Sequence, residues 1–245
     1  YYFSKFFTKL LKETDEDPQI NRVIHNINSL KVDVAYPFLL DVYVDCDKGI
    51  ISKEELLKIF LMVESYIFRR SICDIPTNSL NKTFPNLRSE IEKESYLESV
   101  KASFNLKETY RRFPSDEEFR THFILKNVYN TTRIRKYILD KLENADRPKE
   151  RVNVDDYTIE HIMPQNKNLP EQWREELGGH WKEIQEKYLH TIGNLTLTEY
   201  NSELSDKSFL EKRNMEGGFG ESPIKLNRVL GTLETWNEEQ ILARA

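Results

Sequence analysis

Apolar residues recur at spacings of three and four over the first 145 positions, the pattern of helices that each bury one face. The opening segment is the clearest example, with apolar residues at Phe3, Phe6, Phe7, Leu10 and Leu11. Further helices are predicted over residues 20–27, 37–44, 53–68, 96–103, 115–129 and 131–142. Pro85 should interrupt a short helical piece that begins near Leu80. Residues 1–145 are therefore predicted to form a helical domain.

After residue 151 the pattern includes short stretches that suit β-strands. Residues 157–162 are rich in β-branched and aromatic side chains and stop before Pro164, so we expect a strand there. A turn at Gly193 leads into a second strand. Helices are predicted over residues 170–177, 180–189, 200–204, 209–213, 223–233 and 237–243. We expect a mainly α chain whose residues 152–245 form a small α+β domain, joined to the helical domain by a polar linker at residues 143–151.

Composition limits the class of protein. The chain has 245 residues, 31% of them charged and 38% apolar, which is enough for a sizeable core. Its two cysteines, Cys46 and Cys73, suit the reducing cytoplasm and provide neither a disulfide framework nor a zinc site. No apolar run reaches the length of a membrane span, and no signal peptide is visible. The chain opens at Tyr1 inside an amphipathic pattern, so we expect it to be part of a longer protein.

Charge is distributed unevenly along a chain whose net charge is −5. Residues 152–215 contain 7 Lys and Arg against 12 Asp and Glu, which disfavours tight non-specific DNA binding by that segment. Residues 131–151 contain 7 basic residues against 4 acidic ones. This preceding stretch, or a domain outside the chain, is therefore expected to supply the electrostatic attraction for nucleic acid.

Residues that suit phosphodiester cleavage follow one another in the second domain. A neutral imidazole can take the proton of an attacking water near pH 7, and His161 lies in the first predicted strand. Glu160 precedes it and should point to the other face, where its carboxylate could hold a metal. Asn194 can tie the loop after the strand through its side chain. Asn201 offers a second oxygen ligand, and Lys207 is available for a phosphate.

The same residues carry a resemblance to known nucleases. The order Glu160-His161, Gly193-Asn194-Leu-x-Leu, Asn201, Lys207 is similar to the HNH (ββα-metal) nuclease domain and to the His-Asn-Asn variant in RNA-guided DNA nucleases. The longer strings over residues 161–165, 190–198 and 201–205 look closer to the HNH-like domain at the C-terminal end of GmrSD-type modification-dependent (type IV) restriction proteins. Residues 65–82 resemble the helical region of that architecture, which follows an N-terminal ParB/sulfiredoxin-like nucleotide-binding domain.

The resemblance implies a metal-dependent DNA endonuclease that serves as the cutting part of a phage-defence protein. Its partners would be DNA and the N-terminal nucleotide-binding domain of the same protein. The cofactor would be a divalent metal, Mg²⁺ first and Mn²⁺ as the alternative. By the same resemblance, the general base would be His161, the metal ligands Glu160 and Asn201, and the orienting residue Asn194, with His190 and Lys207 as further candidates.

Two features depart from common HNH domains. The segment between His161 and Asn194 is long and carries helices of its own, and no pair of cysteines holds a structural zinc. Each residue also has a structural alternative, since Asn201 can cap a helix, Lys207 can be an exposed charge, and His190 can be a strand-edge residue. A catalytically inactive nucleic-acid-binding or assembly module, and an RNA nuclease, therefore remain alternatives to the DNA endonuclease.

Overall fold

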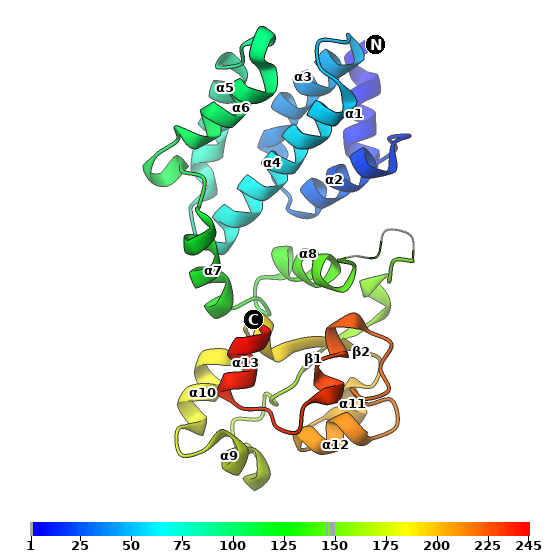
Figure 1. The fold of residues 1–245 in the computed structure, drawn as a ribbon, viewed down its shortest axis with the longest axis vertical. Coiled ribbons are helices and arrows are strands. Elements are labelled where there is room, and N and C mark those ends of the chain that lie inside the picture. Colours follow the sequence, from blue (N-terminus) through cyan, green and yellow to red (C-terminus); the bar gives the residue numbers. More distant parts are fainter. Residues whose placement is uncertain (1, 146, 148–149) are drawn as a thin grey trace. The chain divides into compact units, whose positions relative to one another are not determined.

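The computed structural model describes residues 2–145, 147 and 150–245 and separates into two compact units. The first reaches Phe119, and the second runs from Arg120 to Ala245. Helices dominate the described residues, and their only sheet has two strands, both in the second unit (Figure 1). This architecture confirms the predicted fold class, a mainly α chain with a small α+β part.

The first unit is helical throughout. Its helices are α1 (Tyr2–Lys12), α2 (Pro18–Ser29), α3 (Tyr36–Asp47), α4 (Lys53–Ile72), α5 (Leu80–Ser89), α6 (Tyr96–Asn105) and α7 (Asp116–Leu125), the last of which ends in the second unit. Short 3-10 turns separate some of them: η1 (Asp33–Ala35), η2 (Thr77–Ser79), η3 (Lys93–Ser95) and η4 (Thr109–Arg111). The expected interruption at Pro85 is wrong, because Phe84 and Leu87 are buried on either side of it and their packing outweighs the loss of one helical hydrogen bond.

The first helix that lies entirely in the second unit is α8 (Thr132–Glu143), which ends at the first residue of the expected linker at residues 143–151. Three residues of that linker, Asp146, Pro148 and Lys149, lie outside the described part of the chain. The Glu143 carboxylate accepts hydrogen bonds from the backbone N–H groups of Lys225, at 2.8 Å, and Leu226, at 3.0 Å. These contacts explain why α8 groups with the residues that follow it, whereas the sequence places the boundary after it.

Helices and 3-10 turns surround the two strands of the second unit. The strands are β1 (Thr158–His161) and β2 (Leu195–Thr198), and the helices after α8 are α9 (Glu171–Leu177), α10 (Trp181–Tyr188), α11 (Asn201–Leu204), α12 (Phe209–Asn214) and α13 (Glu238–Arg244). The turns are η5 (Val154–Asp156), η6 (Ile192–Asn194), η7 (Lys225–Asn227) and η8 (Leu230–Thr232). The helix expected over residues 223–233 is wrong: η7 and η8 stand there, and a Cβ at Gly231, within η8, would lie 3.3 Å from Cα of Gly220.

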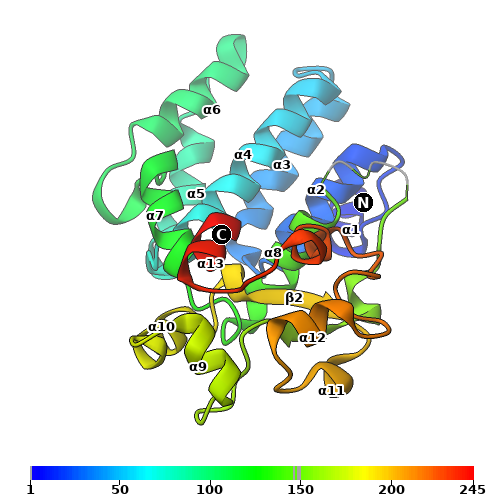
Figure 2. The same ribbon diagram turned by 60° about the horizontal axis from the view of Figure 1, so that its bottom comes forward.

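The sheet is an antiparallel pair in which Glu160 lies opposite Thr196 and His161 opposite Leu195. Figure 1 shows α11 and α12 beside these strands, and Figure 2 shows α12 next to β2. Asn227 of η7 holds the outer side of β2, because its Nδ2 donates to the carbonyl of Leu197 at 2.9 Å. The strands are thus fixed from both sides, although each is only four residues long.

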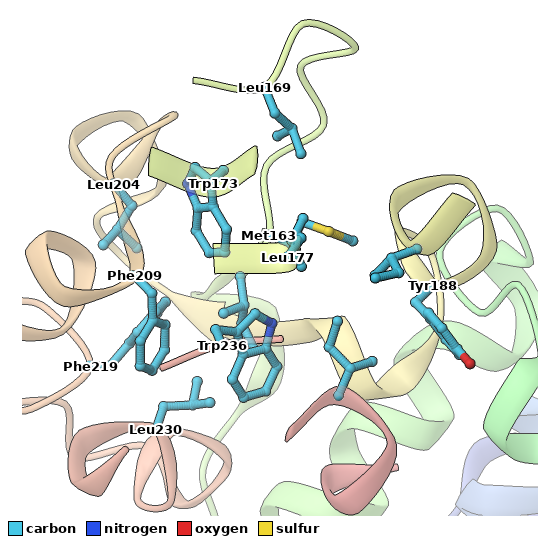
Figure 3. Packing of buried hydrophobic residues seen from close by; sticks show 13 residues of the cluster. Met163, Leu169, Trp173, Leu177, Tyr188, Leu204, Phe209, Phe219, Leu230 and Trp236 are labelled. Carbon is cyan, nitrogen blue, oxygen red and sulfur yellow. The ribbon is translucent and has the colours of Figure 1, made fainter. Parts of the chain in front are cut away.

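One hydrophobic cluster holds the second unit together (Figure 3). Trp173 and Trp236 are fully buried within it. Phe209, the first residue of α12, stacks on Trp236 with ring centroids 5.5 Å apart. The cluster also takes in Ile162 and Met163, the two residues after β1. The chain that carries His161 is therefore anchored directly to the core.

Candidate active site

At the C-terminal end of β1, the buried His161 is paired with the half-buried His190. His161 is 4% exposed, and its Nε2 lies 3.1 Å from Nδ1 of His190 in a shared hydrogen bond. Tyr129 packs its ring edge-on against His161, with centroids 4.5 Å apart, and stacks on His190 at 5.2 Å. The backbone N–H groups of Val128 and Tyr129 donate to the carbonyl of His190, at 2.9 and 3.2 Å. Sequence reasoning did not find Tyr129, because no motif connects it to either histidine.

Electrostatics keep His161 neutral. Burial is the largest cause, and together with the neighbouring His190 and Lys212 it lowers the pKa of His161 to about 3. Burial also lowers the pKa of the partly buried His190. At pH 7 both imidazoles can therefore accept a proton, and one of the two nitrogens in their contact carries the shared hydrogen.

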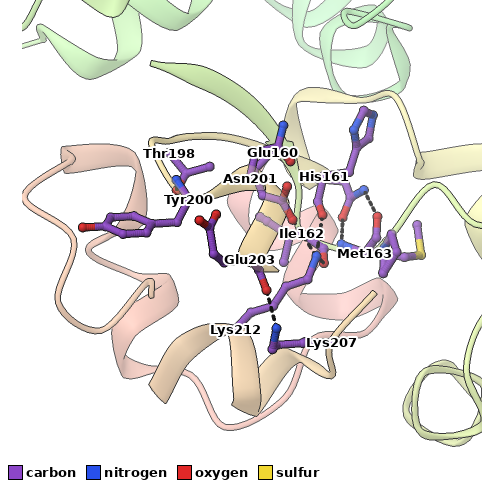
Figure 4. Close-up of polar contacts among 12 residues, drawn as sticks. Glu160, His161, Ile162, Met163, Thr198, Tyr200, Asn201, Glu203, Lys207 and Lys212 are labelled. Carbon is purple, nitrogen blue, oxygen red and sulfur yellow. Dashed lines mark hydrogen bonds and ion pairs between the residues drawn. The ribbon is translucent and has the colours of Figure 1, made fainter. Parts of the chain in front are cut away.

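Glu160 points to another partner, the ammonium of Lys212. Lys212 Nζ lies 2.5 Å from Glu160 Oε1 and donates to the carbonyls of His161, at 3.0 Å, and Ile162, at 3.1 Å (Figure 4). Burial raises the pKa of Glu160 and lowers the pKa of Lys212, and each charge opposes the shift of the other. Their close pairing offsets part of the cost of burying both groups.

Sequence reasoning missed Lys212, although the sequence does contain a pointer to it. Lys212 lies three residues after Phe209, so in a helix both side chains face the same way. Phe209 is buried in the core, which brings the lysine inward as well. The position of a lysine on the apolar face of a short helix therefore indicates that Lys212 is buried.

Asn194, predicted to orient the loop after β1, is fully buried and uses both ends of its amide. Its Oδ1 accepts from the backbone N–H of Met163 at 2.7 Å and from Trp236 Nε1 at 3.2 Å. Its Nδ2 donates to the carbonyls of Met163, at 3.0 Å, and Leu189, at 3.1 Å. Asn194 therefore links the segment after His161 to the segment before His190.

Asn201 and Lys207 occupy different surroundings. Asn201 begins α11 next to β1, and its Nδ2 donates to the carbonyl of Ile159 at 3.2 Å. Lys207, between α11 and α12, donates to the carbonyl of Glu203 four residues earlier, at the exposed surface (Figure 4). Asn201 thus lies against β1, the strand that carries Glu160 and His161, whereas the Lys207 ammonium bonds the end of α11.

The chemistry of the donor set suits a hard divalent ion. Lys212 engages Oε1 of Glu160, so Oε2 remains as a carboxylate oxygen. Since Asn201 donates through Nδ2, its Oδ1 faces away from that donor bond as an amide oxygen. One carboxylate and one amide oxygen fit Mg²⁺, which keeps several waters of its own. Among the described residues no group of three acidic, histidine or cysteine side chains gathers to hold a metal.

Comparison with known proteins yields one match. A sequence model of the C-terminal domain of GmrSD restriction endonucleases matches residues 113–245, more than half of the chain. No curated protein and no solved structure matches. In the described part of the chain, none of the helices has both the length and the apolar character that a membrane crossing requires.

Proposed function

The chain belongs to the GmrSD restriction endonucleases through their C-terminal domain, and we propose that its second unit cuts phosphodiester bonds of DNA with a divalent metal in an HNH-type site. The observation that carries this proposal is the neutral, buried His161 at the end of β1, a strand that also carries the Glu160 carboxylate and binds Asn201 through the carbonyl of Ile159. A general base must be unprotonated at working pH and held in place, and His161 meets both conditions.

His161 would act as the base. In the tautomer in which His161 Nε2 donates to His190 Nδ1, Nδ1 of His161 is the acceptor for the proton of the attacking water. A base with a pKa of about 3 is a weak acceptor, but a phosphodiester anion close by raises that pKa again because negative charge favours the imidazolium. The hydroxide forms its bond to phosphorus as the leaving oxygen departs and takes a proton from solvent.

Glu160 and Asn201 would hold the metal, and Asn194 would keep the base, His161, in its position. When bound, Mg²⁺ or Mn²⁺ relieves the negative charge at phosphorus and stabilises the leaving oxygen. Asn194 contributes without touching the substrate, since its four hydrogen bonds fix the backbone on both sides of the histidine pair. His190, partly exposed, would share the proton with His161 and lie closer to solvent.

The proposed partners follow from the family. We propose modified foreign DNA as the substrate, within phage defence, and an N-terminal nucleotide-binding domain of the same protein as the regulatory partner. The test uses full-length protein on plasmid DNA, modified phage DNA and RNA, with magnesium, with manganese and with EDTA. Cleavage of DNA that requires the metal supports the proposal. Cleavage of RNA alone would replace the substrate, and metal-independent cleavage would contradict the roles of Glu160 and Asn201.

One observation favours a second function, a nucleic-acid-binding module without catalysis. The Glu160 carboxylate is already paired with a buried ammonium, and His161 Nε2 is engaged by His190. In such a module DNA binding would not depend on a metal. The same assay decides between the two, because a binding module retains DNA in EDTA and cuts no substrate under any condition.

A further inference from the structure

Lys212 is one of the most deeply buried charged residues in the described chain, and three consecutive residues of one strand end accept its hydrogen bonds. The side chain has no exposed surface. Its Nζ contacts Glu160 Oε1, the carbonyl of His161 and the carbonyl of Ile162, at 2.5, 3.0 and 3.1 Å. A single ammonium thus reaches the carboxylate beside the base and the backbone of the base itself.

These contacts leave the ammonium without capacity for DNA. A protonated lysine has three N–H donors, and the three acceptors account for all of them. A lysine that binds phosphate needs a donor directed towards solvent, and Lys212 has none to spare. Its role in any reaction at this site must therefore pass through Glu160 and His161.

The helix that carries Lys212 is held rigidly at both ends. Ser208 and Glu211 form a capping box at the start of α12, and Phe209 is packed in the core. At the other end, the backbone N–H of Phe219 donates to the carbonyl of Lys212 at 3.0 Å. Gly218 makes this closure possible, because a Cβ there would lie 2.3 Å from that carbonyl oxygen. The backbone at Lys212 is therefore fixed in position, and its ammonium is held against its three acceptors.

We infer that Lys212 is a positioning residue of the proposed nuclease site: its buried ammonium joins the Glu160 carboxylate to the backbone carbonyls after it and so sets the place of the His161 ring. This inference rests on the proposed function for its catalytic consequence. Its structural consequence, the dependence of the His161 ring on Lys212, can be measured separately.

The kinetic test compares Lys212→Met with Lys182→Met, an exposed lysine of α10, in full-length protein. A misplaced base costs on the order of a hundredfold in rate, so we expect kcat of Lys212→Met to fall by about that factor. KM for DNA should stay within about threefold of wild type, and the salt dependence of DNA binding should not change, because the ammonium does not reach phosphate. Unchanged kcat, or a raised KM with a reduced salt dependence, would overturn the inference.

The second measurement does not need cleavage. In protein labelled with ¹⁵N at histidine, the ring resonances of His161 and His190 should shift in Lys212→Met, while those of exposed His180 stay in place. The double variant Glu160→Gln/Lys212→Met removes both buried charges and serves where the single variant does not fold. His161 resonances that match wild type in either folded variant contradict the positioning role. If the wild-type protein cuts no substrate, the proposed function fails. These spectra then still test whether Lys212 positions the His161 ring.

Discussion

Replacing Asn194 by alanine should destabilise the second unit severely. The change leaves two buried N–H donors, on Met163 and on the Trp236 indole, and two carbonyls, on Met163 and Leu189, without their partner. An unsatisfied buried donor costs about 1–3 kcal/mol, and a carbonyl with a second lone pair costs less, so we expect a loss of about 4 kcal/mol. Total stabilities are typically about 5–15 kcal/mol, so this loss is a large share.

Tryptophan fluorescence in urea measures this loss selectively. The three tryptophans of the chain, Trp173, Trp181 and Trp236, all lie in the second unit, so the first unit does not contribute to the signal. The matched control is Asn166→Ala, because Asn166 is exposed and its side chain bonds Asp206 and the backbone N–H of Asn168, both at the surface. A surface change of this kind should stay within about 0.5 kcal/mol of wild type.

Asn194→Asp sharpens the test. Aspartate keeps an oxygen for the N–H groups of Met163 and Trp236 but loses the donor for Met163 and Leu189, and it places a charge in a fully buried position. It should therefore be destabilising as well, despite its matching shape. A free energy of unfolding of Asn194→Ala within about 1 kcal/mol of wild type would refute the reasoning, since the loss of four hydrogen bonds at a buried site should cost more than that.

Three further predictions concern the same unit. Trp236→Phe keeps an aromatic ring in the core but removes the indole donor to Asn194, and should cost about 1–3 kcal/mol in the same urea titration; no loss would show that the bond contributes nothing. Gly218→Ala forces a Cβ against the carbonyl of Lys212, 2.3 Å away, and should lower the melting temperature measured by circular dichroism, whereas an unchanged value would mean that the turn can shift freely. The pKa of His161 is about 3 in the folded protein against 6.5 for the free side chain, so the unfolded chain binds the extra proton between those values and stability falls as pH drops from 6.5 towards 3, by up to about 1.4 kcal/mol per pH unit. Urea titrations at pH 7, 6 and 5 give the free energy of unfolding at each pH, and this free energy should fall less with decreasing pH in His161→Gln than in wild type. An equal fall in the two proteins would contradict the burial of a neutral ring.

Periodicity predicts much of this fold because its helices follow simple local rules. Ser52 caps α4 in a capping box with Glu55, a local pattern that the sequence contains, and β1 lies within the predicted first strand. The errors arise where packing overrides local preference. Pro85 stays inside α5 between buried neighbours, and the segment at η7 and η8 is held by side chains such as Asn227, whose hydrogen bond to Leu197 no sequence window contains.

The candidate site is only partly visible in the sequence. Motif order selects His161, Asn194 and Asn201, because their spacing along the chain is itself the pattern. Lys212 and Tyr129 are found only in the folded chain, since each meets His161 or its neighbours across a long sequence separation. Whether Lys212 is buried beside Glu160 depends on how α12 packs. The sequence indicates that packing only through the spacing of three residues between Phe209 and Lys212.

The single-turnover rate of plasmid nicking by full-length protein tests the central claim most directly. Wild type, His161→Ala and His180→Ala are compared with saturating protein and magnesium, with DNA binding measured in parallel. His180 is an exposed histidine of the same unit and serves as the matched control. General-base catalysis contributes on the order of 10²–10⁴, so His161→Ala should lose at least about a hundredfold while binding DNA normally, and His180→Ala should keep the wild-type rate. Equal rates for wild type and His161→Ala would contradict the assignment of His161 as the base.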